Sequence, residues 1–270
     1  MKRELFNIAD EEFITLLDRT DAAFRNKGIP YMFVGGVATQ ACNAAYLNSI
    51  NNASLTELKS KGFRMQDYFR ATDDVDIAIH LDDQGKDKEV REINARNKIF
   101  SVLDDIVGSE DFISPTEEHI INIKLHRRGH VKPEFELGID GVADSDKIIA
   151  FNIFRNPREL NNTPLKEFEE RFYDKFLNEA VNINIRYAPN AAISLRVKRP
   201  EHLIATKIAN KRDKDVADVL SIMRYSKQAG CPIVYELIEE ILCGRDLKYN
   251  IQNEFLCKRY ELLKELVKTL

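Results

Sequence analysis

Hydrophobic residues recur at helical spacing near the start of the chain, with polar residues between them. The apolar positions that share one helical face are Phe13, Leu16, Leu17 and Phe24. This pattern predicts an amphipathic helix over residues 10–27. Gly28 ends the helix, because glycine commonly follows a helix and Pro30 cannot continue one.

A short, wholly apolar run follows the first helix. Residues 31–34 hold Tyr, Met, Phe and Val, which is typical of a buried strand. Gly35 and Gly36 close the run, and residues 37–46 predict a second helix. The more polar segment 47–69 is expected to be a mobile or helical insertion. The chain therefore predicts a strand, a two-glycine turn and a helix in succession.

Polar and apolar residues then alternate along residues 74–81. A strand has a period of two, so Val75, Ile77 and Ile79 share one face. Asp74 and Asp76 share the other. This segment is expected to be a strand with a polar face at its beginning.

Further segments predict five strands and two helices. The strands are expected at residues 121–125, 135–139, 148–154, 181–187 and 193–197. The helices are expected at residues 82–107 and 165–177. The first two of these strands flank Arg127, Arg128 and Gly129, and this spacing predicts a hairpin.

The pattern changes after Pro200. Three helical segments follow, at residues 201–225, 234–243 and 254–270. The chain therefore predicts an α/β (α+β) fold, in which a mixed-sheet domain at residues 1–199 precedes a helical domain at residues 200–270. A length of 270 residues is compatible with two domains of ordinary size.

Composition narrows the function classes. Hydrophobic residues make up 44% of the chain and charged residues 31%, enough for a core, so a mainly disordered chain is excluded. No apolar run approaches the ~18 residues that span a bilayer, so no membrane association is expected. The cysteines are scattered without a paired motif: Cys42, Cys231, Cys243 and Cys257. Reduced thiols and a cytoplasmic location are expected.

The two-glycine turn is the first candidate for chemistry. Gly35 and Gly36 let a phosphate approach the backbone, and the helix after them offers N–H groups to it. A tight turn with no ligand is the alternative.

Two carboxylates on one strand face are the second candidate. Asp74 and Asp76 lie ~6–7 Å apart along the predicted strand, and carboxylates this close repel one another unless a cation lies between them. Hard oxygen ligands suit Mg²⁺, one ion or two. A solvated strand start is the alternative, and Asp73 fits that description.

A third carboxylate would complete a site for two metal ions, which orients an attacking hydroxyl in phosphoryl transfer. Glu136 is the candidate, because it is central in the predicted strand at residues 135–139. Glu134 and Asp140 remain alternatives at the ends of that strand.

Charged residues near the domain boundary form one stripe if their helix is unbroken: Lys207, Lys211, Lys214, Asp215 and Asp218. A lysine of this stripe could meet triphosphate oxygens. An ordinary solvated helix face is the alternative.

The order of these motifs resembles the minimal nucleotidyltransferase family of the DNA polymerase β superfamily. The resemblance rests on residues 33–36, residues 72–76 and an acidic strand. Residues 203–218 are similar to the AbiEii-type toxin nucleotidyltransferases, with a lysine, an arginine and then Lys-Asp-x-x-Asp. The matching positions are Lys207, Arg212, Lys214, Asp215 and Asp218. Glu136 stands where the family usually has aspartate.

The resemblance implies transfer of a nucleoside monophosphate from an NTP to an acceptor hydroxyl. It assigns Mg²⁺ to Asp74, Asp76 and Glu136. Residues implied at the nucleotide are Gly35, Gly36, Thr72, Lys207, Lys211 and Asp215. Lys207 would neutralise the triphosphate, and Arg212 would tie its helix to the sheet through Asp215 or Asp218. A toxin-like member would act on the 3′ end of a tRNA, and a cognate antitoxin is a further expected partner.

The acceptor stays open on the residues alone. The net charge is −4, so RNA would need a local basic patch. Candidates for that patch are Arg127, Arg128, Lys132, Arg196, Lys198, Arg199, Lys207, Lys211, Arg212 and Lys214. The alternatives are a small-molecule (antibiotic) nucleotidyltransferase and a catalytically weak protein that binds a nucleotide or a partner.

Overall fold

A computed structural model gives the fold of the chain. It describes residues 5–72, 74–80, 123–126, 138–141, 147–154, 163–210, 212–243 and 250–269, with seven helical positions between residues 94 and 106. The elements in these ranges are α1 (Glu11–Asn26), β1 (Tyr31–Phe33), α2 (Gly35–Asn51), α3 (Leu55–Ser60), the 3₁₀ helix η1 (Met65–Asp67), β2 (Asp74–Ile79), β3 (Ile123–His126), β4 (Gly138–Gly141), β5 (Lys147–Phe154), α5 (Thr163–Asn178), β6 (Val181–Ala188), β7 (Ala191–Val197), α6 (Pro200–Asn210), α7 (Asp213–Gln228), α8 (Tyr235–Cys243) and α9 (Asn250–Thr269). The fold is α+β.

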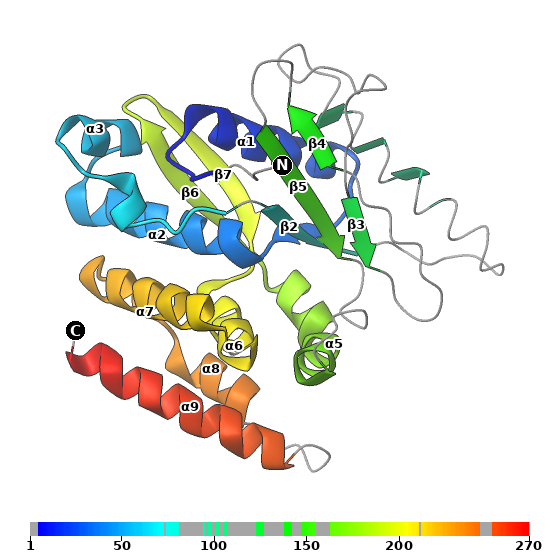
Figure 1. The fold of residues 1–270 in the computed structure, drawn as a ribbon, viewed down its shortest axis with the longest axis vertical. Coiled ribbons are helices and arrows are strands. Elements are labelled where there is room, and N and C mark those ends of the chain that lie inside the picture. Colours follow the sequence, from blue (N-terminus) through cyan, green and yellow to red (C-terminus); the bar gives the residue numbers. More distant parts are fainter. Residues whose placement is uncertain are drawn as a thin grey trace.

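The described strands form one mixed sheet (Figure 1) of seven strands in the order β3-β5-β2-β1-β7-β6, with β4 paired to β5. β1 is antiparallel to β2, with Phe33 opposite Ile77, and parallel to β7. β2 is parallel to β5. The end of β1 therefore lies beside the beginning of β2, and this edge of the sheet carries both candidate motifs.

The predicted elements at the start of the chain are confirmed. The four apolar positions of the predicted helix are all buried in α1, and all three residues of β1 are buried. Gly28 has a φ of +63°, a left-handed conformation that glycine adopts without strain. Segment 47–69 is largely helical and holds the end of α2, then α3 and η1.

The predicted hairpin around Arg127 is wrong. β3 pairs with β5 in parallel, β4 pairs with β5 antiparallel, and β3 and β4 do not pair with one another in the described ladders. The sequence of β5 is an almost continuous apolar run, typical of a strand inside a sheet whose two faces are both covered. β3 and β4 therefore both pair with β5 and do not form a hairpin with each other through the turn between them.

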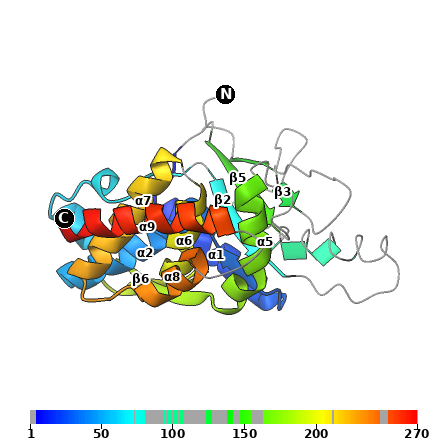
Figure 2. The same cartoon turned by 90° about the horizontal axis from the view of Figure 1, so that it is seen from below.

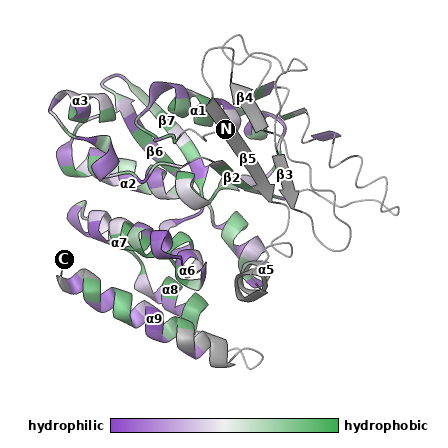
Figure 3. Ribbon diagram, in the orientation of Figure 1, coloured by the Kyte–Doolittle hydropathy of each residue, from purple (hydrophilic) through white to green (hydrophobic). Residues whose placement is uncertain are grey.

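The C-terminal helices form a layer beside α2, which lies between α7 and the sheet (Figure 1). Figure 2 shows α9 as the outermost helix of this layer. Hydrophobic and hydrophilic residues alternate along α9 (Figure 3), as expected for a helix with one packed face. The boundary at residues 199/200 stays a prediction.

Two cysteines correct the expectation of four reduced thiols. Cys243 at the end of α8 and Cys257 in α9 form a disulfide. Cys42 is free and buried, and Cys231 is free and exposed. The sequence did not predict the pair, because their 14-residue separation follows no paired motif. Among the described helices, none is long and apolar enough to cross a membrane.

Candidate active site

The glycine turn begins the candidate site. The Val34 N–H donates to the Asp76 carbonyl at 2.9 Å, which holds the end of β1 against β2. Gly35 follows with a φ of +59° and starts α2. The first N–H groups of a helix have no partner within the helix, and they carry partial positive charge. The turn therefore places a helix N-terminus at the edge of the sheet where β2 begins.

Asp76 packs directly against Gly35. A Cβ at residue 35 would lie 2.2 Å from Oδ2 of Asp76, so only glycine leaves room for this carboxylate. Asp76 is partly buried. A carboxylate from β2 thus reaches the start of α2, and two motifs 41 positions apart in the sequence form one site.

Thr72 packs against Gly36 in the same way. A Cβ at residue 36 would lie 2.7 Å from the Thr72 Oγ1. Thr72 is buried, and its backbone exchanges two hydrogen bonds with Phe6, at 2.8 and 2.9 Å. The space that a side chain at residue 35 or 36 would fill is therefore occupied by Asp76 and Thr72, respectively. The two glycines let these two side chains lie against the backbone.

The expected metal ligands are described in part. Asp74 lies two residues before Asp76 on β2, at the register position of Ala150, and its side chain is outside the described part of the chain. Among the side chains that the structure does describe, no group of three His, Cys, Asp or Glu could hold a metal ion. The Asp76 carboxylate beside a helix N-terminus has the hard-oxygen chemistry that Mg²⁺ requires. The described part of the site therefore fits Mg²⁺ through one ligand and leaves the others as predictions.

Glu136, the predicted third carboxylate, lies outside the described residues, as does Glu134. The strand next to β2 is β5, where Asn152 is the register partner of Asp76. On the other side of β5, Lys124 takes the position opposite Asn152. Asp140 lies in β4, opposite Ile148. β4, which carries Asp140, pairs with β5 and is not a neighbour of β2 in the described sheet, and the position of Glu136 relative to Asp76 stays a prediction.

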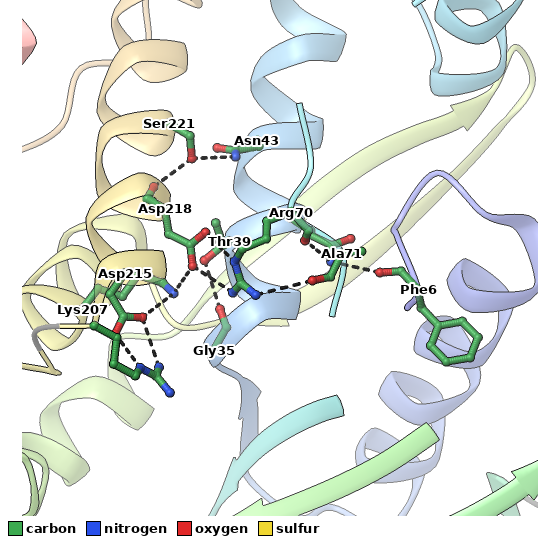
Figure 4. A network of polar contacts seen from close by, with 12 residues as sticks. Phe6, Gly35, Thr39, Asn43, Arg70, Ala71, Lys207, Asp215, Asp218 and Ser221 are labelled. Carbon is green, nitrogen blue, oxygen red and sulfur yellow. Dashed lines mark hydrogen bonds and ion pairs between the residues drawn. The ribbon is translucent and has the colours of Figure 1, made fainter. Parts of the chain in front are cut away.

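The charged stripe is divided between two helices. α6 ends at Asn210 and α7 begins at Asp213, so the expected unbroken helix is wrong. The turn nevertheless brings Lys207 to both aspartates of α7. Its Nζ lies 2.6 Å from Asp218 Oδ2 and 3.6 Å from Asp215 Oδ1, and it is 4% exposed (Figure 4).

Arg212 completes the other half of this cluster. Its guanidinium donates two hydrogen bonds to Asp215, at 2.7 and 3.1 Å. The expected pairing of Arg212 with a carboxylate of the motif is therefore observed, but it closes the α6–α7 turn and does not reach the sheet. Lys211 lies outside the described residues, and Lys214 is exposed.

These contacts favour structural roles for the stripe. Asp215 is fully buried and faces two protein cations, which disfavours the expected nucleotide contact of this carboxylate. The ammonium of Lys207 is held by two carboxylates. Its contact with a triphosphate stays a prediction.

Arg70 is a site residue that the sequence analysis missed. Its Nε and Nη2 donate to the two oxygens of Asp218, at 3.1 and 3.0 Å. It lies four residues before Asp74, directly after the segment 47–69 that was expected to be an insertion, and its partner is 148 positions away. The only local signal is an arginine shortly before the acidic strand.

Asp218 of α7 and His202 of α6 are two of the buried groups with shifted pKa values. Burial raises the pKa of Asp218, but the hydrogen bonds and charges of Arg70 and Lys207 outweigh it and hold the pKa below its usual value. Burial lowers the pKa of His202 to about 3, and the nearby positive charges of Lys198 and Arg199 act in the same direction. At neutral pH the network around Asp218 is therefore ionic, whereas His202 is neutral.

Two lysines of the basic stretch expected to bind RNA point inward. Lys198 is 2% exposed and Lys207 is 4% exposed. Arg196 donates to two backbone carbonyls, Arg199 pairs with a carboxylate two residues away, and Arg212 pairs with α7. Lys198 and Lys207 therefore serve the fold, whereas the side chain of Arg212 is 53% exposed although it pairs with Asp215. The RNA-binding surface stays a prediction. Arg127, Arg128 and Lys132 lie outside the described residues.

Comparison of the chain with known protein families and with curated proteins finds no match.

Proposed function

We propose that the chain is a Mg²⁺-dependent nucleotidyltransferase that moves a nucleoside monophosphate from an NTP to an acceptor hydroxyl. The observation that carries the proposal is the packing of the Asp76 carboxylate on Gly35 at the start of α2. A carboxylate and a helix N-terminus at one point suit a metal ion and phosphate oxygens, respectively.

In the proposed reaction, the acceptor oxygen forms a bond to the α-phosphorus as the bond to pyrophosphate breaks. Asp76, with Asp74, would hold Mg²⁺, which neutralises phosphate charge when bound. The N–H groups at the start of α2 would orient the phosphates. Glu136 is proposed to accept the proton of the hydroxyl.

The acceptor is the less supported part of the proposal. A tRNA 3′ end is the acceptor that the family resemblance implies, with an antitoxin as the expected regulator. The burial of Lys198 and Lys207 favours a smaller acceptor, because these two side chains cannot contribute to an RNA-binding surface where they lie. A small-molecule hydroxyl is therefore the second candidate.

The test is incubation of the full chain with each labelled NTP, Mg²⁺ and either total tRNA or a panel of small-molecule acceptors. Labelled product with release of pyrophosphate is the expected result, and it should vanish with EDTA. Mg²⁺-dependent NTP binding without transfer to any acceptor would favour the nucleotide-binding alternative, consistent with Asn152 at the register position beside Asp76. Neither binding nor transfer would overturn the proposal.

A further inference from the structure

The guanidinium of Arg70 lies between the helical layer and the glycine turn. Its Nε and Nη2 donate hydrogen bonds to the two carboxylate oxygens of Asp218 on α7, at 3.1 and 3.0 Å. Its Nη2 also lies 3.6 Å from the point that a Cβ of Gly36 would occupy. One planar group therefore binds α7 and lies close to the beginning of α2 (Figure 4).

Asp218 is fixed from several directions. Lys207 of α6 binds the same carboxylate at 2.6 Å. The Asp218 carbonyl accepts from Ser221, and Ser221 in turn accepts from Asn43 of α2 at 3.0 Å. Asp218 is 3% exposed. Its position is therefore set by α2, α6 and α7, and it has little freedom to move.

The backbone of Arg70 is fixed from the opposite side. Gln40 of α2 donates to the Arg70 carbonyl at 3.0 Å, and it accepts from the Ile8 N–H at 2.6 Å. Two residues later, Thr72 pairs with Phe6 and packs on Gly36. The chain that leads into β2 is thus held by its backbone to α2 and by one side chain to α7.

We propose that Arg70, held by Asp218, is a positioning residue that keeps the Gly35-Gly36 turn and the start of β2 in the arrangement needed for nucleotide transfer. This inference rests on the function proposed above. A bidentate fork fixes orientation as well as distance, which a lysine ammonium cannot do. The geometry of the fork, rather than charge alone, is therefore the feature under test.

Arg70→Lys in the full chain tests the proposal, with Arg212→Lys as the matched control. Both arginines donate two hydrogen bonds to an aspartate of α7, but Arg212 binds Asp215 and has no described contact with the glycine turn. We expect Arg70→Lys to lower kcat at least tenfold, with KM for the NTP changed less than threefold. Arg212→Lys should keep kcat within threefold at a similar loss of melting temperature. Equal kcat losses in the two variants would overturn the proposal.

Amide hydrogen exchange gives a readout that needs no activity. In Arg70→Lys and Asp218→Asn, the amides of Val34, Ala38 and residues 74–76 should exchange at least tenfold faster than in the wild-type chain. In Arg212→Lys they should be unchanged. Unchanged exchange in Arg70→Lys would overturn the positioning role even if the wild-type chain transfers no nucleotide. Faster exchange in an inactive wild-type background would support the positioning role while the proposed function fails.

Discussion

Two pairs of closely spaced aspartates differ in their surroundings. Asp215 and Asp218, on α7, are buried and bound by Lys207 and two arginines. On β2, Asp76 packs on a left-handed glycine at a helix N-terminus, with Asp74 two residues before it. The helical pair has the partners of an internal ion network, whereas the strand pair lies where a ligand could be held. Neighbours, rather than spacing, distinguish the two pairs.

Asp76→Asn should cause the largest loss of transfer activity, because it removes the charge of the proposed metal ligand. We expect transfer to fall by about 10²-fold or more, in line with the loss of a preorganised electrostatic group. The melting temperature should stay within a few degrees of the wild-type value. Initial rates at saturating NTP and a melting curve measure both. Asp213→Asn, an exposed aspartate of α7, is the control and should leave both unchanged.

A loss of stability without a loss of rate in Asp76→Asn would mean that the strand pair is as structural as the helical pair. The comparison drawn above would then fail.

Lys207→Met tests the structural side. Removing a buried cation costs about 3 kcal/mol, below the full cost of a broken pair because Arg70 and Arg212 still bind the two carboxylates. Urea unfolding should show this loss. Lys227→Met, at an exposed position of α7, should change stability by less than about 0.5 kcal/mol. A turnover loss of about 10²-fold in the folded variant would support the predicted phosphate contact of Lys207.

Gly35→Ala measures how closely the strand pair and the turn are coupled. Backbone strain and the displaced Asp76 carboxylate should together cost about 2 kcal/mol. Gly28→Ala is the matched control, because its φ of +63° resembles the +59° of Gly35 but nothing lies within 4 Å of its Cβ. Gly28→Ala should cost only about 1 kcal/mol, and thermal unfolding separates the two. Equal losses would show that the contact with Asp76 contributes nothing.

The dependence of stability on acid pH distinguishes the contribution of Asp218 from that of His202, the neutral histidine on the same helix as Lys207. The pKa of His202 is lowered from 6.5 to about 3, so between these values only the unfolded state binds the proton. Stability should therefore fall as the pH falls from about 6.5, by at most about 1.4 kcal/mol per pH unit. Asp218 has a lowered pKa, so its contribution is lost only below about pH 3.8. In His202→Phe, the stability should no longer fall between pH 6.5 and about pH 4, whereas the loss below about pH 3.8 should remain. An unchanged slope of stability against pH above about pH 4 would contradict this assignment.

Local periodicity explains which parts of the fold were predictable. α1, β1 and β2 each carry a complete pattern within a few residues, and Gly35 follows directly from its strand. The pairing of β3 and β4 with β5 was not predictable, since partner choice joins residues far apart in the sequence.

In the candidate site, too, local motifs were predictable from the sequence and contacts between distant residues were not. Gly35 and Asp76 were each predicted from a local motif, and the structure brings these two residues together. The contact between Arg70 and Asp218 has no local signal, because it depends on the helix break between Asn210 and Asp213 and on the packing of α7 near α2. A charged face on a helix looks the same in sequence whether solvent or a buried partner covers it.

The separation of Arg70 from Asp218 has a consequence for how the chain folds. The pair closes a loop of 148 residues, and the contact between Asn43 and Ser221 closes one of 178. Contacts between residues so far apart in the sequence form late in folding, since the entropy of loop closure must be overcome before they stabilise the folded chain. On the ribosome, the glycine turn and β2 emerge long before α7 is synthesised. The candidate site therefore reaches its final geometry only after the helical layer has been translated and has docked.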